Sequence, residues 1–286
     1  MVAQQHRSGG GARVVRALVA VGVTAAAAGC SGGGGADRAA AAADARDGGV
    51  EVVRRAAAVL AGDGVASAEV STSMETAAGG TRVTIRGSGS YDFRAGSGRL
   101  KVVLPPDAAG EEEHRPITEL LAPGALYMMN RGAGVPAGKW VRIDTTALDD
   151  GNLVTGGVTD PLAAAELLRG AGAVTYVGET DVAGVAVRHY RGTADIGRAA
   201  RLAAPGARAA LAAAAKGFRT RAVPFDAYLD EQGRLRKVRH RFSFANEGPA
   251  AEVVSTTLLY GFGVPVTVRL PHDRDIYTGE IEQGRA

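Results

Sequence analysis

The sequence has one cysteine and few aromatic residues. The single cysteine, Cys30, excludes an internal disulfide, so the fold must be held by its hydrophobic core alone. Aromatic residues make up 5% of the 286 residues. Small apolar side chains must therefore fill much of the interior, and inside a large sheet they leave space that dense packing would otherwise remove.

The sequence also has little excess of charge of either sign. Lys and Arg number 33 against 30 Asp and Glu, and Arg7, Arg13 and Arg16 are the only charged residues before Cys30. From Cys30 onward the chain is neutral, which argues against general nucleic-acid binding because that requires surplus cations for phosphates. Two basic clusters, at 198–221 and 234–241, are expected to be solvated faces. The alternative is that they are patches for anionic lipid headgroups.

The sequence also lacks a hydrophobic run long enough to span a membrane. The apolar stretch from Ala17 to Ala28 is shorter than the roughly 20 residues that a transmembrane helix needs. It follows a basic start and ends in small residues before Cys30, an order typical of a secretory signal peptide. We assign residues 1–29 to that signal.

Cys30 stands where such a signal would be cleaved. The residues Ala27-Ala28-Gly29-Cys30 resemble a lipobox, in which cleavage precedes the cysteine and a diacylglycerol is attached to its sulfur. Cys30 is thus the predicted lipidation site, and it would anchor the protein to the outer face of the cytoplasmic membrane, in the cell envelope. The alternative is ordinary cleavage after Ala28, which leaves Cys30 as a free thiol.

The rest of the chain divides into a linker and a domain. Residues 30–49 lack aromatic and branched apolar side chains, so we assign them to a flexible Gly/Ala tether. Residues 50–286 are assigned to a single domain, since all-β folds commonly exceed about 200 residues without dividing.

Hydrophobic periodicity predicts both helices and strands in this domain. Asp160-Pro161 opens a helix through Leu168, with Asp160 as its N-cap. The other expected helices lie at 50–60, 117–122, 196–204 and from 205 to 216. The expected strands lie at 66–74, 83–85 continuing to 91–93, 100–104, 126–129, 139–143, 171–180, 185–193, 223–230, 235–245, 252–260 and 264–270.

This order of elements predicts an α+β fold. Strands adjacent in sequence should pair in an antiparallel sheet, and roughly ten or eleven strands rarely remain flat and open. We expect a large curved antiparallel sheet, a half-open β-barrel, with helices packed on its concave side. Such a sheet can enclose an apolar cavity.

Several stretches of the domain are similar to a known family. These stretches are 138–144, 160–168, 177–192, 223–236 and 262–266. In them the chain resembles the lipid-carrier lipoproteins of high-GC Gram-positive bacteria, the LppX/LprG type, which share the fold of LolA and LolB. The resemblance implies a half-open barrel with an apolar cavity for acyl chains.

From this we expect a membrane-anchored lipoprotein that binds acylated lipid or glycolipid and carries or shields it across the envelope. The cavity candidates are apolar residues of the helices and of one strand face: Leu162, Leu167, Leu168, Leu202, Phe225 and Leu229. Partners would be the lipid, the membrane and an envelope transporter or receptor protein, without nucleic acid. The alternative is an envelope protein-interaction or sensing module without lipid cargo.

Catalytic, metal and cofactor sites are not indicated. The five histidines never occur at metal-ligand spacing, and no second cysteine exists. His189 and His240 are expected to be satisfied structural imidazoles in strands. Asp226 and Asp230 lie about 13 Å apart along a strand, too far for paired catalytic carboxylates, and are expected at solvated strand ends. We therefore expect a binding protein and not an enzyme, with no cofactor.

Overall fold

The computed structural model describes residues 48–62, 66–78, 81–105, 115–132, 134–156, 158–244 and 251–279. The predicted signal peptide, Cys30 and most of the predicted tether lie outside these residues. Residues 48 and 49, assigned to the end of the tether, are helical, and the helical residues 48–60 bury Val53 and Leu60. Glycine lowers helix propensity, so the sequence pattern placed the start of this helix too late.

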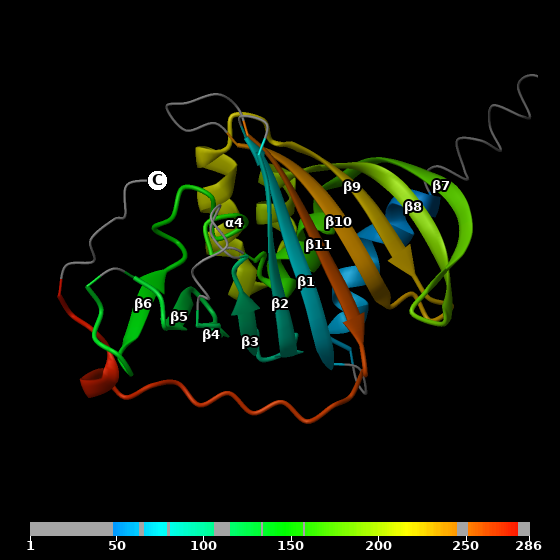
Figure 1. The fold of residues 1–286 in the computed structure, drawn as a ribbon. Helices are drawn as coiled ribbons and strands as arrows, with labels where there is room; N and C mark the ends of the chain where they lie inside the picture. Colours follow the sequence, from blue (N-terminus) through cyan, green and yellow to red (C-terminus); the bar gives the residue numbers. More distant parts are fainter. Residues whose placement is uncertain are drawn as a thin grey trace, which may run out of the picture.

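Eleven strands of the described residues form one antiparallel sheet (Figure 1). In sheet order they are β6 (Trp140–Asp144), β5 (Ala125–Met129), β4 (Ile117–Ala122), β3 (Ser97–Val103), β2 (Thr81–Asp92), β1 (Ser67–Ala78), β11 (Ala251–Tyr260), β10 (Leu235–Phe244), β9 (Ala222–Leu229), β8 (Val185–Asp195) and β7 (Ala171–Val182). Pairing of β1 with β11 joins two meanders, β1 to β6 and β7 to β11. β6 and β7 lie at opposite ends, so the sheet is not closed. The predicted fold class is confirmed.

The two faces of the sheet differ in burial. We call core face the one that carries Val70, Tyr91 and Phe225, which are fully buried. We call open face the opposite one, which carries the partly exposed Ser71 and Lys237. The two sets alternate along each strand because successive side chains of a strand point to opposite sides.

The helices cover the core face, on the concave side of the sheet (Figure 1). They are the helical residues 48–60, α2 (Pro161–Leu167) with its 3-10 continuation (Leu168–Gly170), α3 (Ile196–Leu202) and α4 (Pro205–Gly217). Asp160 caps α2 as predicted, because its carboxylate accepts hydrogen bonds from the amides of Leu162 and Ala163 at 2.7 and 3.1 Å. Within the described ranges, no helix is both long enough and apolar enough to cross a bilayer.

The expected helix at 117–122 is wrong, since these residues form β4. Pro123 and Gly124 make a two-residue turn in which Gly124 has φ +74°, a conformation that glycine adopts without strain. The chain returns at once as β5, so β4 pairs with β3 on one side and β5 on the other. These pairings bury Ile117 and Leu121 in the core.

The expected strand at 264–270 is also wrong, because this stretch is extended but joins no ladder. Residues 261–279 leave β11 and run past the ends of the central strands to β6, closed by a 3-10 turn at Asp273–Asp275 (Figure 1). The Ser67 hydroxyl donates to the carbonyl of Val264 at 2.7 Å, and the Tyr277 amide to the carbonyl of Trp140 at 2.8 Å. β1 is already paired on both sides, so it offers residues 264–270 no free edge.

Candidate functional site

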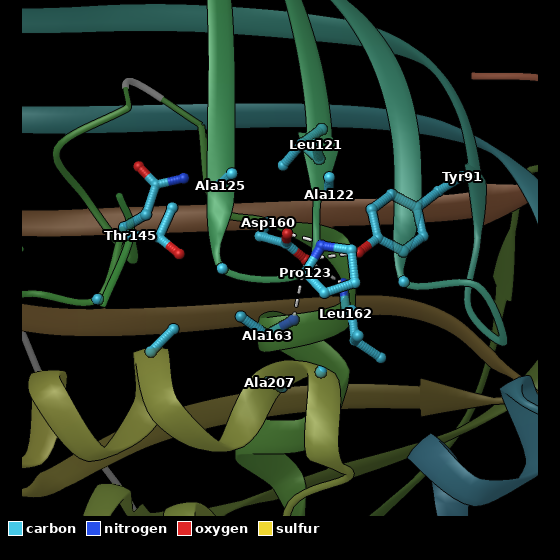
Figure 2. Close-up of a pocket in the computed structure, with 16 residues that line it drawn as sticks. Tyr91, Leu121, Ala122, Pro123, Ala125, Thr145, Asp160, Leu162, Ala163 and Ala207 are labelled. Carbon is cyan, nitrogen blue, oxygen red and sulfur yellow. Dashed lines mark hydrogen bonds between the residues drawn. The ribbon is translucent and has the colours of Figure 1, made fainter. Parts of the chain in front are cut away.

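A small cavity lies where α2 and α4 meet the turn between β4 and β5 (Figure 2). Its walls are mainly small and apolar, and they include Ala122, Ala125, Ala163, Ala207, Ala210, Leu121 and Leu162. The volume is about 20 Å³, which is room for about one water molecule. Sites for drug-sized ligands span about 300–1,000 Å³, so an acyl chain enters here only if the helices move.

One pole of this cavity is polar. The Tyr91 hydroxyl donates to the Asp160 carboxylate at 3.2 Å, next to the N-terminus of α2 (Figure 2). Burial and the neighbouring carboxylate raise the pKa of Tyr91 well above its usual value. Burial also raises the pKa of Asp160, although hydrogen bonds from the amides of Ala163 and Leu162 oppose that shift. The pair thus provides a hydroxyl and a carboxylate at the end of an alanine-lined wall.

The six predicted cavity residues do not line one common cavity in the structure. Leu167, Leu168, Phe225 and Leu229 are fully buried and fill the interior as ordinary core residues. Leu162 lines the small cavity. Leu202 ends α3 and is 50% exposed, because the inward face of α3 is formed by its alanines. It therefore does not lie with the others, and the role of all six in lipid binding remains a prediction.

Glu119 is a buried acidic residue that the sequence reasoning missed. It lies in β4 with 1% exposure, and its Oε1 has no hydrogen-bond partner among the described residues. Burial raises its pKa to about 8, with Arg131 opposing the shift, so the carboxyl is protonated at neutral pH. The alternation of Ile117, Glu119 and Leu121 was the available signal, which the expectation of a helix concealed.

A short polar strip crosses the core face of β1, β11 and β10. Thr72 lies directly opposite Thr257, and Ser255 opposite His240. Thr159 donates to Ser255 or accepts from it at 2.6 Å. Within the described ranges, Thr72 Oγ1, Thr257 Oγ1 and His240 Nε2 are buried without a partner. Burial lowers the pKa of His240 to about 3, so its ring is neutral, but it is not the satisfied imidazole that we expected.

We expected Asp226 and Asp230 at solvated strand ends, and this is wrong. Their exposed fractions are 3% and 1%. On the open face, Asp226 accepts hydrogen bonds from His189 and Arg191 at 2.8 Å and from Arg241 at 3.1 Å. Burial raises its pKa, but these donors prevail and hold it below the usual value. His189 also stacks on Tyr228 with ring centroids 4.3 Å apart, a structural role in line with our expectation for that residue.

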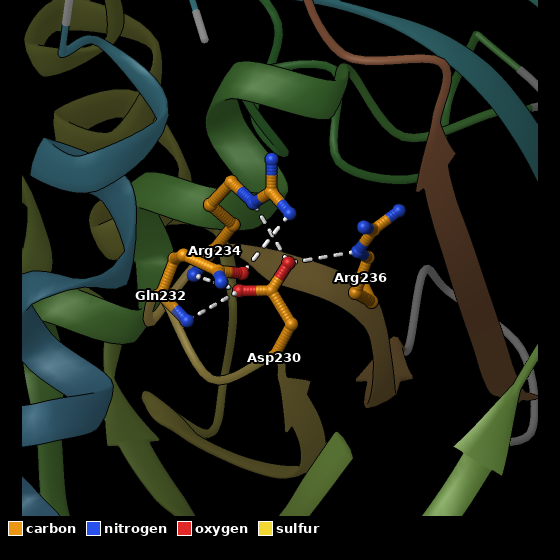
Figure 3. A network of polar contacts seen from close by, with 4 residues as sticks. All are labelled: Asp230, Gln232, Arg234 and Arg236. Atoms are coloured by element: carbon orange, nitrogen blue, oxygen red, sulfur yellow. Dashed lines mark hydrogen bonds and ion pairs between the residues drawn. The ribbon is translucent and has the colours of Figure 1, made fainter. Parts of the chain in front are cut away.

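Asp230 organises the turn between β9 and β10 (Figure 3). It accepts from the amides of Gln232 and Arg234 at 3.1 and 2.9 Å, and from Nε of Arg234 and Arg236 at 2.7 and 2.9 Å. The two guanidinium groups also lie over the Phe262 ring, 4.9 and 4.8 Å from its centroid. This network joins the turn to the residues that follow β11, so its role is structural. Among the described residues, no group of His, Cys, Asp and Glu could hold a metal ion.

Comparisons with known proteins give a likeness of fold. No protein-family model and no curated protein sequence matches the chain. The lipoprotein LppX of Mycobacterium tuberculosis aligns over 78% of this chain and 99% of its own, with 11% identity and a TM-score of 0.43. LprF of Mycobacterium bovis aligns over 79% and 97%, with 12% identity and a TM-score of 0.40.

A third solved structure is an outer membrane lipoprotein-sorting protein domain from Vibrio parahaemolyticus. It covers 74% of this chain and 90% of its own, with 8% identity and a TM-score of 0.30. Identities this low concern the fold and not the ligand. The solved structures that align with this chain thus include the LppX-type lipoproteins that the sequence resemblance named, at TM-scores of 0.43 and below.

Proposed function

We propose that this chain is a lipoprotein of the cell envelope that binds acylated lipid or glycolipid between the helices and the core face of the sheet. It carries or shields the lipid and catalyses no reaction. Anchoring through a lipidated Cys30 would hold it at the outer face of the cytoplasmic membrane.

The observation that carries the proposal is the alanine-lined cavity between α4 and the sheet. α4 buries Ala207, Leu211 and Ala214, and it approaches the 149–151 loop closely at two places, Ala210 against Gly151 and Gly217 against Asp149. Moving α4 outward exposes mostly small side chains. Each methylene of an incoming acyl chain contributes about 0.8 kcal/mol when buried, so a chain of ordinary length offsets that exposure.

Native mass spectrometry tests lipid binding directly. The chain from residue 30 onward, carrying Cys30→Ser, would be purified from its own host without detergent. A discrete added mass that extracts into organic solvent is expected. A bare polypeptide mass that stays unchanged after incubation with host lipids would reject lipid binding.

A pair of leucine variants locates the site. Leu162→Ala enlarges the cavity, whereas Leu259→Ala removes a buried leucine from β11, which does not line it. Both should lose about 2–5 kcal/mol of stability. Lipid should restore the melting temperature of the Leu162 variant more than that of the Leu259 variant, since ligand binding to the native state stabilises it. Equal responses would place lipid elsewhere.

Anchoring has its own test. The wild-type chain should carry the mass of a diacylglycerol on its N-terminal peptide and sediment with membranes. Cys30→Ser should abolish both. An unmodified N-terminal peptide beginning at residue 29 would instead indicate ordinary cleavage after Ala28 and a free thiol.

The filled interior favours a second candidate function, an envelope protein-interaction module without lipid cargo. Leu167, Leu168, Phe225 and Leu229 are fully buried between helices and sheet, as in a purely structural core. The bare mass described above is the result this candidate predicts. Its partner would then be an envelope transporter or receptor protein.

A further inference from the structure

The open face of the sheet carries a groove that lipid binding in the interior does not involve. Its volume is about 460 Å³. The floor is formed by Ser71 and Ser73 of β1 and by Thr256 and Leu258 of β11. Residues 181–183, at the tip of the β7–β8 hairpin, form one wall. Strands distant in sequence thus line an open surface groove of ligand size.

Two cations flank this floor. Arg86 of β2 lies opposite Ser73, and Lys237 of β10 lies opposite Leu258, so β1 and β11 separate them. Three strand spacings and an offset of two residues along the strands place their Cα atoms about 16 Å apart. Their long side chains can both reach a group seated over the serines, from opposite sides.

These cations are not neutralised by neighbouring carboxylates. Arg86 makes no ion pair within the described part of the chain, nor does the adjacent Arg239. Lys237 lies over the Tyr228 ring, 5.2 Å from its centroid. Asp226, on the same face, is already matched by Arg191 and Arg241. Although the chain from Cys30 onward is neutral overall, the groove has a local excess of positive charge.

Hydroxyl groups and one carboxylate complete the lining. Ser71, Ser73 and Thr256 are partly exposed, and their hydroxyls can donate to phosphate oxygens. Asp181, on the hairpin tip, accepts from the Gly184 amide at 2.8 Å through Oδ1, which leaves its other oxygen to accept from a ligand hydroxyl. The groove thus offers cations that can bind a phosphate and a carboxylate that can accept hydrogen bonds from hydroxyl groups. A ligand that carries both a phosphate and hydroxyl groups fits this combination.

We propose that this groove binds a phosphate-bearing polyol. Arg86 contacts the phosphate through its planar guanidinium, which matches phosphate oxygens in pairs, and Lys237 acts as a point charge on the other side. Asp181 receives a hydroxyl of the polyol. The ligand is either the headgroup of an anionic lipid or the corresponding free polyol phosphate. The site is separate from the proposed interior lipid site and does not depend on it.

Titration calorimetry and vesicle flotation test the proposal on the chain from residue 30 with Cys30→Ser. The probes are glycerol 3-phosphate and inositol 1-phosphate in solution, and vesicles of phosphatidylcholine with or without phosphatidylinositol. The test variant is Arg86→Gln with Lys237→Gln. The matched control is Arg115→Gln with Arg142→Gln, which removes the same charge from two exposed cations outside the groove and outside both basic clusters.

The test variant should bind at least about tenfold more weakly than wild type, while the control binds as wild type does. If wild type binds the soluble phosphates and the test variant does not, the proposal is supported and the ligand is a free polyol phosphate. If wild type binds only to vesicles with phosphatidylinositol and the test variant does not, the proposal is supported and the ligand is a lipid headgroup. Absence of all binding, or equal weakening of test and control variants, overturns the proposal.

Discussion

Glu166 of α2 accepts a hydrogen bond from the backbone amide of Ala204, at the junction of α3 and α4, at 2.9 Å. The same carboxylate oxygen pairs with Arg169 at 2.6 Å, and Glu166 is 2% exposed. One buried side chain thus attaches the α3–α4 pair to the helix that is seated in the core. Any opening of the alanine-lined cavity by α4 must strain or break this contact.

Glu166→Ala should therefore loosen α3 and α4. We expect a loss of about 2 kcal/mol, because the Ala204 amide and Arg169 lose their partner, and faster hydrogen exchange across residues 196–217. Glu51→Ala, which removes the exposed pair with Arg55, is the control and should cost under about 0.5 kcal/mol. Exchange that rises equally throughout the protein would contradict a specific attachment.

Thr72→Val should stabilise the protein. The Thr72 hydroxyl is buried without a partner among the described residues, and Thr257 opposite it is in the same state. Replacing the hydroxyl with a methyl group of similar size removes a desolvated donor, so we expect a gain of about 1 kcal/mol in urea unfolding. Thr175→Val, at an exposed position of β7, should change stability by less than about 0.5 kcal/mol. A loss at Thr72 would mean that a water or ligand satisfies it.

The sequence predicted the elements whose signals are local. Asp160-Pro161 marks the start of α2, and Ala183-Gly184, both with positive φ, mark the β7–β8 turn. Local signals failed where pairing decided the outcome. Residues 117–122 form a strand because β3 and β5 flank them, and residues 264–270 do not because no edge is free beside them.

The sites were less predictable than the fold. Asp226 is charged and separated by dozens of residues from His189, one of its partners, so its burial depends on a register that no local pattern encodes. Leu202 resembles the other leucines of the helices in sequence, yet the turn of α3 leaves it exposed. The groove of the open face combines residues of four strands and the tip of one hairpin, and appears only when the sheet is assembled.

Asp230→Ala should destabilise the protein strongly. The carboxylate is 1% exposed and serves two amides and two arginines of the β9–β10 turn. Its removal leaves buried donors and two guanidinium groups unmatched, for which we expect a loss of about 3–5 kcal/mol. The same change at Asp181, which accepts one amide in an exposed turn, should cost about 1 kcal/mol. Similar midpoints for the two variants in urea would show that Asp230 lacks this role.

Glu119 should make stability depend on pH in the direction opposite to that of most carboxyl groups. Its pKa is about 8 in the native state against 4.5 as the ordinary value, so between these two values the native state holds a proton that the unfolded state has released. Unfolding then releases that proton, and stability falls as pH rises, at up to about 1.4 kcal/mol per pH unit. The contribution is complete below pH 4.5 and is lost by about pH 8.

Glu119→Gln removes this titration while keeping a neutral side chain of the same shape. The free energy of unfolding of the variant should rise steadily relative to that of wild type from about pH 5 to pH 8. Above that range the difference between the two should stay constant. Urea unfolding at each half pH unit measures it. Glu252→Gln, which alters an exposed carboxyl of β11, is the control and should give a profile parallel to that of wild type. If the Glu119 variant also ran parallel to wild type, the carboxyl would be ionised in the native state and would need a cation close to it.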